Sequence, residues 1–420
     1  MQDVSNSINL ISHDIIRGSL HKSGIDGGVV RVFANERLIL ELNVTDFNQD
    51  YHTVVDHGGH IAFEAKVNLP LGPETFDIRI TDASGKLLPG GSTVLRPLTT
   101  RKVSDYIGEL RAWLDERFSP AEFIDGRYYG HQPIYGFRQG HSEPNWHDRY
   151  IISYAIMRKL AHLRFNSFFD AGGAEGYKAA LVKHLFGSDV ISCDLSQEAC
   201  NRAADLYGIK TAPIDLHGLA FPDESYDVVL ASETVEHVFD NFRAVDELLR
   251  IARKAVVITV PHETPEQVAD TVKREELHGH IHYFDLKSFN YLKARGYSVH
   301  VEPILSLKRL RRITAVLMEA DVARVQHYKS PLARTLVKLS SYVFKTIFNR
   351  SVASAFMEGD HVAAQSGRYA GMVVVIVKDP SAWSDTPLRP VSMSDVTAFA
   401  VAPLGKDGVG RHGAPVPRPA

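Results

Sequence analysis

The sequence predicts an α/β fold built on an open parallel sheet and preceded by a smaller β-rich domain. Two apolar runs point to the sheet: one ends at Asp170 before a glycine-rich turn and a helical pattern, and the next ends at Asp194. A third acid, Asp215, comes before another apolar run at 226–230. The first hundred residues differ, because short β-rich runs alternate there with glycine turns.

The three acids predict a pocket for a cofactor that carries a nucleoside. The carboxyl ends of the strands of an open parallel sheet meet at one crevice, and ligands bind there. Gly172, Gly173 and Gly176 allow the backbone a sharp turn and a close approach to a ligand. The spacing places Asp194 where an acid accepts both ribose hydroxyls. Asp215 is placed to accept a hydrogen bond from the exocyclic amine of an adenine.

The glycine-rich turn distinguishes two classes of cofactor. It lacks the dinucleotide spacing G-x-G-x-x-G, because Ala171 stands where the first glycine belongs. Written as D-x-G-x-(G/A)-x-G, with Asp170, Gly172, Ala174 and Gly176, the turn resembles motif I of class I S-adenosylmethionine-dependent methyltransferases. Ala174 replaces the usual glycine of that motif, and we expect the preceding glycine to supply the lost freedom.

The resemblance continues beyond this loop. Residues 219–227 are similar to the "LPFPDESFD" segment of the family, and residues 231–238 resemble its "sevlEHv" segment. The second segment is typical of the ubiquinone-biosynthesis-like branch (types 11 and 23) and of related small-molecule or glycan branches. Residues 280–297 resemble "EHxxFFsxxeLxxLLxxaGF", with Gly279 in place of the usual glutamate. The likeness covers roughly residues 145–305 and 368–380.

This resemblance implies a Rossmann-like seven-stranded sheet, S-adenosylmethionine as cofactor and methyltransferase activity. It also implies the residues that hold the cofactor: Asp170, Gly172, Gly173 and Gly176 in the loop, Asp194 at the ribose, Asp215 and Leu216 at the adenine, Glu233 near the methionine end, and Leu195 as a further contact. A dehydrogenase and a non-catalytic scaffold that kept the fold are the alternatives.

Methyl transfer to a hydroxyl needs alignment of the reactants and a base for the hydroxyl proton. His237 and His280 follow the fourth and fifth strands of the expected sheet, so they are the candidate catalytic residues, with Glu236 placed to orient His237. Surface or packing roles are the alternative in a chain with 20 histidines. His278, His280 and His282 alternate along the chain, a spacing that suits zinc. We expect no metal, since no nearby cysteine or clustered acid completes such a site.

We predict a β-sandwich-like domain at 1–100, a helical connector and candidate lid at 101–144, a methyltransferase domain at 145–380 with a basic helical insertion at 306–366, and a disordered tail at 381–420. The β-domain resembles those fused to bacterial surface-polysaccharide enzymes, although a folding or dimerisation domain explains it equally well. The insertion suits docking on an anionic membrane, a cap over the acceptor, or an oligomer contact.

The preferred acceptor is therefore a hydroxyl of a bacterial surface glycan or its lipid-linked precursor, with a quinone-like or other small molecule as the alternative. Lys and Arg (47) nearly balance Asp and Glu (50), which argues against nucleic-acid binding. The two cysteines, Cys193 and Cys200, are too few for a disulfide framework. The N-terminus lacks the features of a signal peptide. We expect a cytoplasmic protein whose insertion allows peripheral contact with the inner membrane face.

Overall fold

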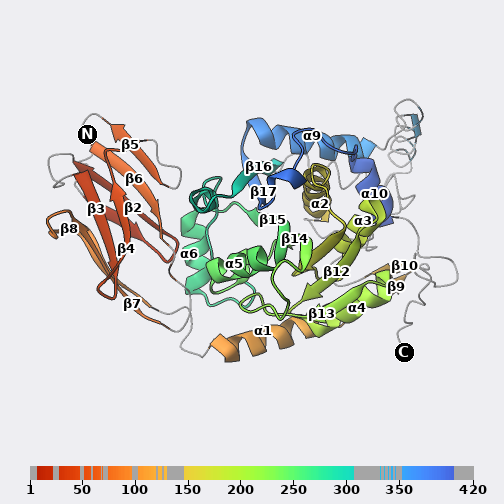
Figure 1. The fold of residues 1–420 in the computed structure, drawn as a ribbon, viewed down its shortest axis with the longest axis horizontal. Coiled ribbons are helices and arrows are strands. Elements are labelled where there is room, and N and C mark those ends of the chain that lie inside the picture. The colour runs from red at the N-terminus through yellow and green to blue at the C-terminus, as the bar shows by residue number, and fades with distance from the viewer. Residues whose placement is uncertain are drawn as a thin grey trace. The chain divides into compact units, whose positions relative to one another are not determined.

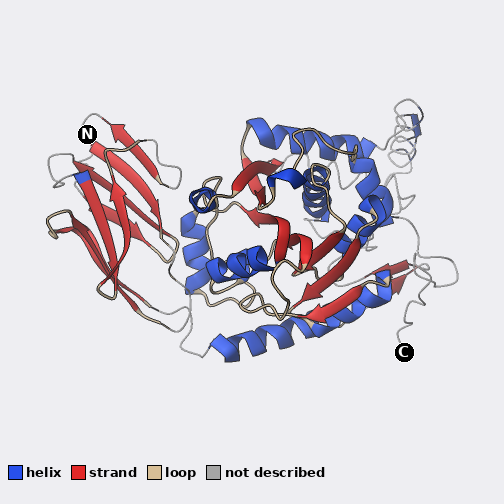
Figure 2. Cartoon of the chain, viewed as in Figure 1, coloured by secondary structure: helices blue, strands red, loops and turns tan. Residues whose placement is uncertain are grey.

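The structure is a computed structural model. It describes residues 7–21, 28–47, 52–57, 60–67, 69, 74–96, 103–119, 122–124, 127–129, 146–306, 332, 335, 339, 342–343, 346 and 352–401. The chain forms two compact units (Figures 1 and 2). The first comprises Met1–Leu110, Val235–Val245 and Glu263–Val299, and the second comprises Arg111–Thr234, Asp246–His262 and His300–Ala420.

Eight antiparallel strands form the β-rich part of the first unit. One sheet has the order β1-β2-β6-β5 and the other β4-β3-β7-β8. The strands are β1 (Ser7–Ile11), β2 (Ile15–His21), β3 (Val29–Ala34), β4 (Arg37–Asn43), β5 (Thr53–His57), β6 (His60–Lys66), β7 (Phe76–Asp82) and β8 (Leu87–Leu95). The alternation of apolar and polar residues explains why these segments form strands. In β6, for example, Ile61, Phe63 and Ala65 are buried and their neighbours are not. Both sheets contribute side chains to one buried apolar cluster.

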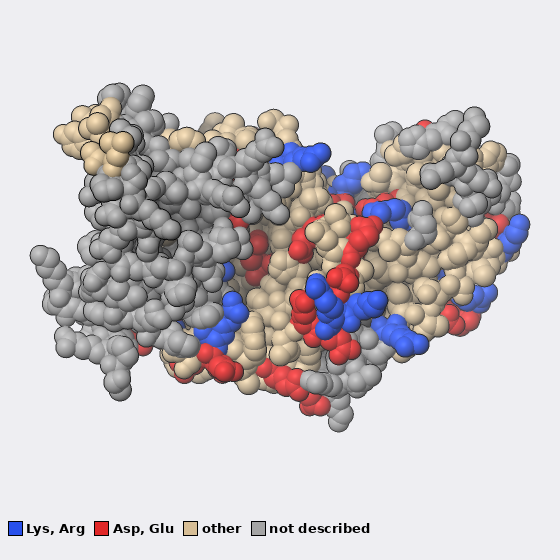
Figure 3. Space-filling model, turned by 180° about the vertical axis from the view of Figure 1, so that it is seen from behind, with Lys and Arg blue, Asp and Glu red and all other residues tan. Residues whose placement is uncertain are grey.

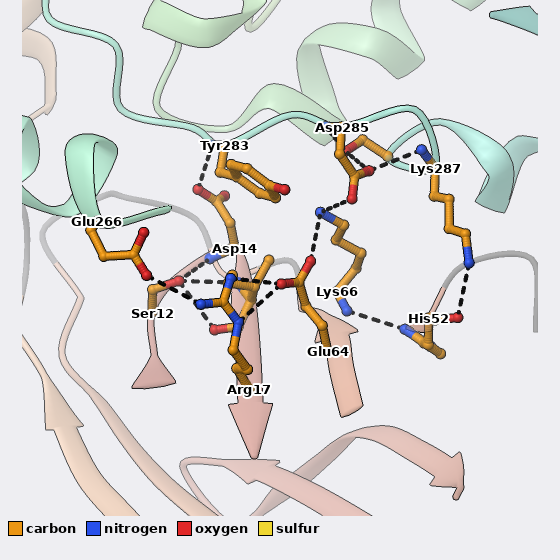
Figure 4. A network of polar contacts seen from close by, with 12 residues as sticks. Ser12, Asp14, Arg17, His52, Glu64, Lys66, Glu266, Tyr283, Asp285 and Lys287 are labelled. Atoms are coloured by element: carbon orange, nitrogen blue, oxygen red, sulfur yellow. Dashed lines mark hydrogen bonds and ion pairs between the residues drawn. The ribbon is translucent and has the colours of Figure 1, made fainter. Parts of the chain in front are cut away.

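The first unit also includes later parts of the chain: η3 (Val235–His237), α6 (Pro265–Lys273) and η4 (Asn290–Arg295). Polar contacts connect Glu266 of α6 and residues 282–287, which lie between α6 and η4, to the β-rich part of the unit (Figure 4). The carboxylate of Asp14 lies 2.8 Å from Nδ1 of His282 and accepts the backbone N–H of Tyr283 at 2.9 Å. Lys66 forms an ion pair with Asp285 at 3.1 Å. The contiguous boundaries predicted from the sequence therefore do not match this unit, because contacts between segments more than 200 residues apart define it.

The second unit is built on a seven-stranded sheet with the order β13-β12-β11-β14-β15-β17-β16. Its strands are β11 (Ser167–Ala171), β12 (Asp189–Asp194), β13 (Lys210–Pro213), β14 (Tyr226–Ser232), β15 (Ala252–Pro261), β16 (Ser298–Ser306) and β17 (Tyr369–Val377). The central pairs are parallel, whereas β17 runs antiparallel to β15, with Ile258 opposite Val374. The expected Rossmann-like sheet with a late antiparallel strand is thus present.

Helices cover one face of this sheet with a continuous apolar cluster. They are α2 (Trp146–Leu160), α3 (Tyr177–Phe186), α4 (Gln197–Tyr207), α9 (Val352–Ser366) and α10 (Met393–Val401) (Figure 1). The predicted disorder of 381–420 is wrong for 381–401, since Met393 and Val396 of α10 are fully buried. The apolar spacing of that helix outweighs the surrounding prolines and serines.

The remaining described elements are α1 (Val103–Phe118), which matches the expected connector helix, β9 (Glu122–Ile124), β10 (Arg127–Tyr129), α5 (Asn241–Ile251) and η6 (Pro380–Ala382). Most of the candidate lid and of the basic insertion lies outside the described residues. Within the described part of the chain, no helix has the length and apolar character needed to cross a membrane. Acidic and basic side chains are intermixed on the described surface in Figure 3, in keeping with the nearly balanced composition.

Candidate functional site: a nucleoside cradle and a histidine pair

The glycine-rich turn leaves β11 and leads into α3, and it is held to the end of β12. The backbone N–H groups of Gly172 and Gly173 both donate to the carbonyl of Cys193 at 2.8 Å. Gly172 has φ 75°, and a Cβ there would lie 2.5 Å from Thr234. Only glycine fits this close approach.

The expectation that Gly173 compensates for the alanine of the motif is wrong. Ala174 itself adopts a left-handed φ of 49°, whereas Gly173 is not among the residues with positive φ. The N–H of Ala174 donates to Asp194 at 2.9 Å, and this hydrogen bond holds the strained backbone in place. The loop is thus fixed by its contacts rather than by glycine freedom at this position.

Asp170 and Asp194 lie together beneath the loop, at the ends of neighbouring parallel strands. Both are buried, and neither carboxylate oxygen of Asp170 has a hydrogen-bond partner among the described residues. Burial raises the pKa of Asp170 to about 6, an effect that Lys178 partly offsets and Asp194 increases. Burial also raises the pKa of Asp194, against the hydrogen bonds donated by the backbone of Ser196 and Ala174. Two buried acids of this kind favour a cationic ligand.

The other predicted cofactor contacts have separate partners. Asp215 accepts hydrogen bonds from Nδ1 of His217 at 2.7 Å and from its backbone N–H at 3.0 Å through the same oxygen. Burial alone would raise the pKa of Asp215, but these hydrogen bonds outweigh it and lower the pKa. Leu216 is buried and Leu195 half-buried. Glu233 has φ 54° and donates its backbone N–H to Thr259 at 2.9 Å.

The structure brings the two predicted catalytic histidines together in the first unit. The ring centroids of His237 and His280 are 4.9 Å apart. Nδ1 of His237 lies 3.0 Å from the carbonyl of Gly279, and Nδ1 of His280 lies 2.7 Å from the carboxylate of Glu263. Because both partners only accept, each Nδ1 carries the proton of its hydrogen bond, which leaves Nε2 of a neutral His237 ring as an acceptor.

Glu236 completes this group. Its side chain is fully buried, and its Oε1 lies 3.7 Å from Nε2 of His237. Burial lowers the pKa of His237 well below its usual value, and the nearby His278 and His280 lower it further. His237 is therefore neutral at physiological pH.

Comparison with known proteins finds relatives of the central part of the seven-stranded sheet. Residues 169–259 match the family model described as a methyltransferase domain. This part of the chain is therefore similar to the methyltransferase domains of S-adenosylmethionine-dependent enzymes. A Mycobacterium tuberculosis protein named as a probable S-adenosylmethionine-dependent methyltransferase is 28% identical over 134 residues, which are 32% of this chain and 47% of that protein. The chain thus spans about half the length of the curated relatives that it matches.

Solved structures give weaker likenesses to the methyltransferase domain. The geranyl diphosphate C-methyltransferase of Streptomyces coelicolor, solved with S-adenosylhomocysteine, is 15% identical, with a TM-score of 0.38, covering 66% of this chain and all 100% of that one. The [4+2]-cyclase SpnF is 14% identical, with a TM-score of 0.36, covering 65% and 93%.

The residues of the methyltransferase domain fit S-adenosylmethionine. A carboxylate oxygen accepts more than one hydrogen bond, so Asp194 can bind ribose hydroxyls while holding Ala174 and Ser196. The buried oxygens of Asp170 lack hydrogen-bond partners among the described residues and suit the positive charge of the methionine end. When bound, the cofactor supplies an electrophilic methyl group on a positively charged sulfur.

Sequence reasoning missed one feature of these sites. Asp115 of α1 accepts a hydrogen bond from Oγ of Ser196 at 2.6 Å and so braces the turn after Asp194. No sequence pattern indicates this contact, because 81 residues separate the two side chains.

Glu236, predicted to orient His237, also belongs to a candidate metal-binding cluster. Ligand atoms of Glu236, His237 and His280 lie within 4.8 Å of one another, so this set could hold a metal ion. It differs from the alternating histidines of the sequence, because His282 uses Nδ1 toward Asp14 and Nε2 toward the carbonyl of Val238. Hydrogen-bonded Nδ1 atoms on His237 and His280 are the usual arrangement around a bound metal.

Proposed function

We propose that the protein transfers the methyl group of S-adenosylmethionine to a hydroxyl of a bacterial surface glycan or of its lipid-linked precursor. The histidine pair carries this proposal, because it offers a neutral imidazole Nε2 next to the buried carboxylate of Glu236. A hydroxyl acceptor needs such a base, whereas the sulfur leaves as a neutral thioether and needs no acid.

In this mechanism the chain's own groups align the reactants and take up one proton. Asp194 would bind the ribose and Asp170 would lie toward the positively charged end of the cofactor. As the oxygen–methyl bond forms and the sulfur–methyl bond breaks, Nε2 of His237 accepts the hydroxyl proton. The carbonyl of Gly279 holds the ring in the required tautomer.

Binding of a divalent cation is a second proposed role for the cluster of Glu236, His237 and His280. The ligand set of two histidines and one carboxylate, with both Nδ1 atoms hydrogen-bonded, favours it. Such an ion would lower the pKa of an acceptor hydroxyl. Metal removal with a chelator, followed by return of Mg²⁺, Mn²⁺ or Zn²⁺, distinguishes the two roles: a base alone predicts unchanged turnover.

The glycan acceptor is inferred from the antiparallel β-strands of the first unit and from the basic composition of residues 307–351. The test uses radiolabelled methyl donor with bacterial envelope polysaccharide, with lipid-linked oligosaccharide and with a soluble catechol. Label in the glycan fractions supports the proposal. Equal labelling of the catechol points to a small-molecule acceptor instead, and no transfer to any fraction favours the scaffold alternative.

The role of His237 is tested separately. His237→Ala is expected to lower turnover by about 10²–10⁴-fold, the range of general base catalysis. Binding of S-adenosylhomocysteine should stay within twofold of wild type. His184→Ala, which changes an exposed histidine of α3, is the matched control and should leave turnover unchanged.

A further inference from the structure

The first unit contains a pocket of about 710 Å³ that the proposed reaction does not yet use. Its walls come from the β3–β4 turn, the end of β6 and the start of β7 on one side, and from the start of α5 and residues 283–291 on the other. This volume lies within the range of small-molecule sites. The pocket is therefore large enough for a ligand of two or three rings.

Aromatic side chains form a substantial part of the lining. The rings of Phe242 and Tyr291 are 5.0 Å apart, and both are half-buried. Tyr283 also lines the pocket, with the ammonium of Lys66 4.1 Å from its ring centroid. Flat, partly exposed rings beside polar groups suit the C–H face of a sugar, because a sugar ring is apolar on its face and polar at its edge.

The charged groups of the lining favour an anion. Lys66 is already balanced by Asp285 and Glu64, and both oxygens of Asp14 are engaged (Figure 4). Among the described residues, no carboxylate lies at ion-pair distance from Lys287 or Arg37. The exposed Glu74 is the one acid of the lining without an ion pair to a described residue.

His52 adds a neutral hydrogen-bond donor to this lining. Its Nδ1 accepts the backbone N–H of Lys66 at 3.1 Å, so the ring proton lies on Nε2. Burial and the charges of Lys66 and Lys287 lower the pKa of His52 to about 4, which keeps the ring neutral. The ammonium of Lys287 lies 3.5 Å from the carbonyl of His52, so two donor groups belong to one corner of the pocket.

We propose that this pocket binds an acidic saccharide, a sugar ring bearing a carboxylate or a phosphate, as the part of the acceptor next to the methylated unit. The proposal rests on the proposed glycan methyltransferase function. Tyr283 in the pocket wall is three residues after His280, a separation that the backbone spans in about 10 Å at most. This separation is within the length of a short oligosaccharide.

The test measures binding without any methyl transfer. The full-length protein is titrated by saturation-transfer NMR and calorimetry with trigalacturonate, mannose 6-phosphate and neutral maltotriose. We expect binding of the carboxylate probe, the phosphate probe or both, with maltotriose at least fivefold weaker. Lys287→Ala and Tyr291→Ala should each weaken the acidic probe at least fivefold, and Lys86→Ala, an exposed lysine outside the pocket, should not.

Each outcome decides the proposal. Binding of maltotriose equal to that of the acidic probes overturns the acidic class. No binding of any probe, or binding that survives both pocket variants, overturns the site, whether or not glycan methylation is observed. Binding lost in the two variants supports the pocket even if the labelling experiment finds no glycan methylation, so the two proposals fail separately. Unchanged circular dichroism and melting temperature show that the variants are folded.

Discussion

Replacing Asp170 with asparagine tests how the buried acid of the cofactor loop affects stability. In the fold its pKa rises from 3.8 to about 6 because the carboxyl group is buried. Between these two values the folded state binds more protons than the unfolded state, so stability falls as the pH rises. Asp170→Asn removes this loss, because the amide has the same shape and carries no charge.

The size of the effect follows from the shift. Each pKa unit is worth about 1.36 kcal/mol, so the ionised carboxylate costs the cofactor-free fold about 3 kcal/mol at pH 8. At pH 5 the folded carboxyl group is mostly protonated, and the cost is about 1.6 kcal/mol. The difference in free energy of unfolding between Asp170→Asn and wild type should therefore grow by about 1.4 kcal/mol from pH 5 to pH 8 in favour of the variant.

Urea unfolding of both proteins at pH 5, 6, 7 and 8, followed by tyrosine fluorescence and circular dichroism, gives this difference. Asp189→Asn, an exposed acid on the neighbouring strand β12, is the control and should show no growing difference. A constant difference across the pH range, or an advantage of wild type that increases with pH, would refute the assignment of Asp170 as a buried, uncompensated acid. The variant should also bind S-adenosylmethionine more weakly than wild type.

Three further predictions concern stability. Ala174→Gly should raise the free energy of unfolding by about 0.5–1 kcal/mol. Glycine adopts the left-handed φ without strain, and this gain exceeds the extra chain entropy that glycine loses on folding. Urea unfolding midpoints measure the change, and a destabilised variant would contradict the prediction. Met393→Ala should cost about 2–5 kcal/mol by opening a cavity under α10, whereas unchanged thermal unfolding would mean that this helix is not part of the core. Asp14→Ala should destabilise the first unit by about 3–5 kcal/mol, because the buried His282 loses its counter-charge. Limited proteolysis should then cleave the variant earlier than wild type within residues 1–110. Equal resistance of the two proteins to the protease would argue against the contact.

Much of the methyltransferase domain could be predicted because its determinants are local in sequence. The acids at Asp170 and Asp194 end successive apolar strands, and parallel pairing of β11 and β12 places them side by side. The turn between them needs glycine at Gly172 for steric reasons that a sequence motif records. The pairing of His237 with His280 followed from the expected strand ends in the same way.

The parts that the sequence did not predict depend on long-range contacts. The pairing of Asp14 with His282 joins residues 268 positions apart, and Asp14 lies in no distinctive pattern. The helix α10 was missed because prolines and serines surround a short apolar segment, which is stabilised by packing on α2, α3, α4 and α9. The strain at Ala174 could not be predicted either, since backbone angles depend on what holds the loop.

The central claim is that the paired acids and the glycine turn bind the methyl donor. Calorimetric titration of S-adenosylhomocysteine into wild type, Asp194→Asn and the control Asp189→Asn tests it most directly, with NADH as the competing cofactor class. We predict that wild type and control bind S-adenosylhomocysteine and not NADH, and that Asp194→Asn binds at least tenfold more weakly. Equal binding by Asp194→Asn, or binding of NADH alone, would contradict the claim.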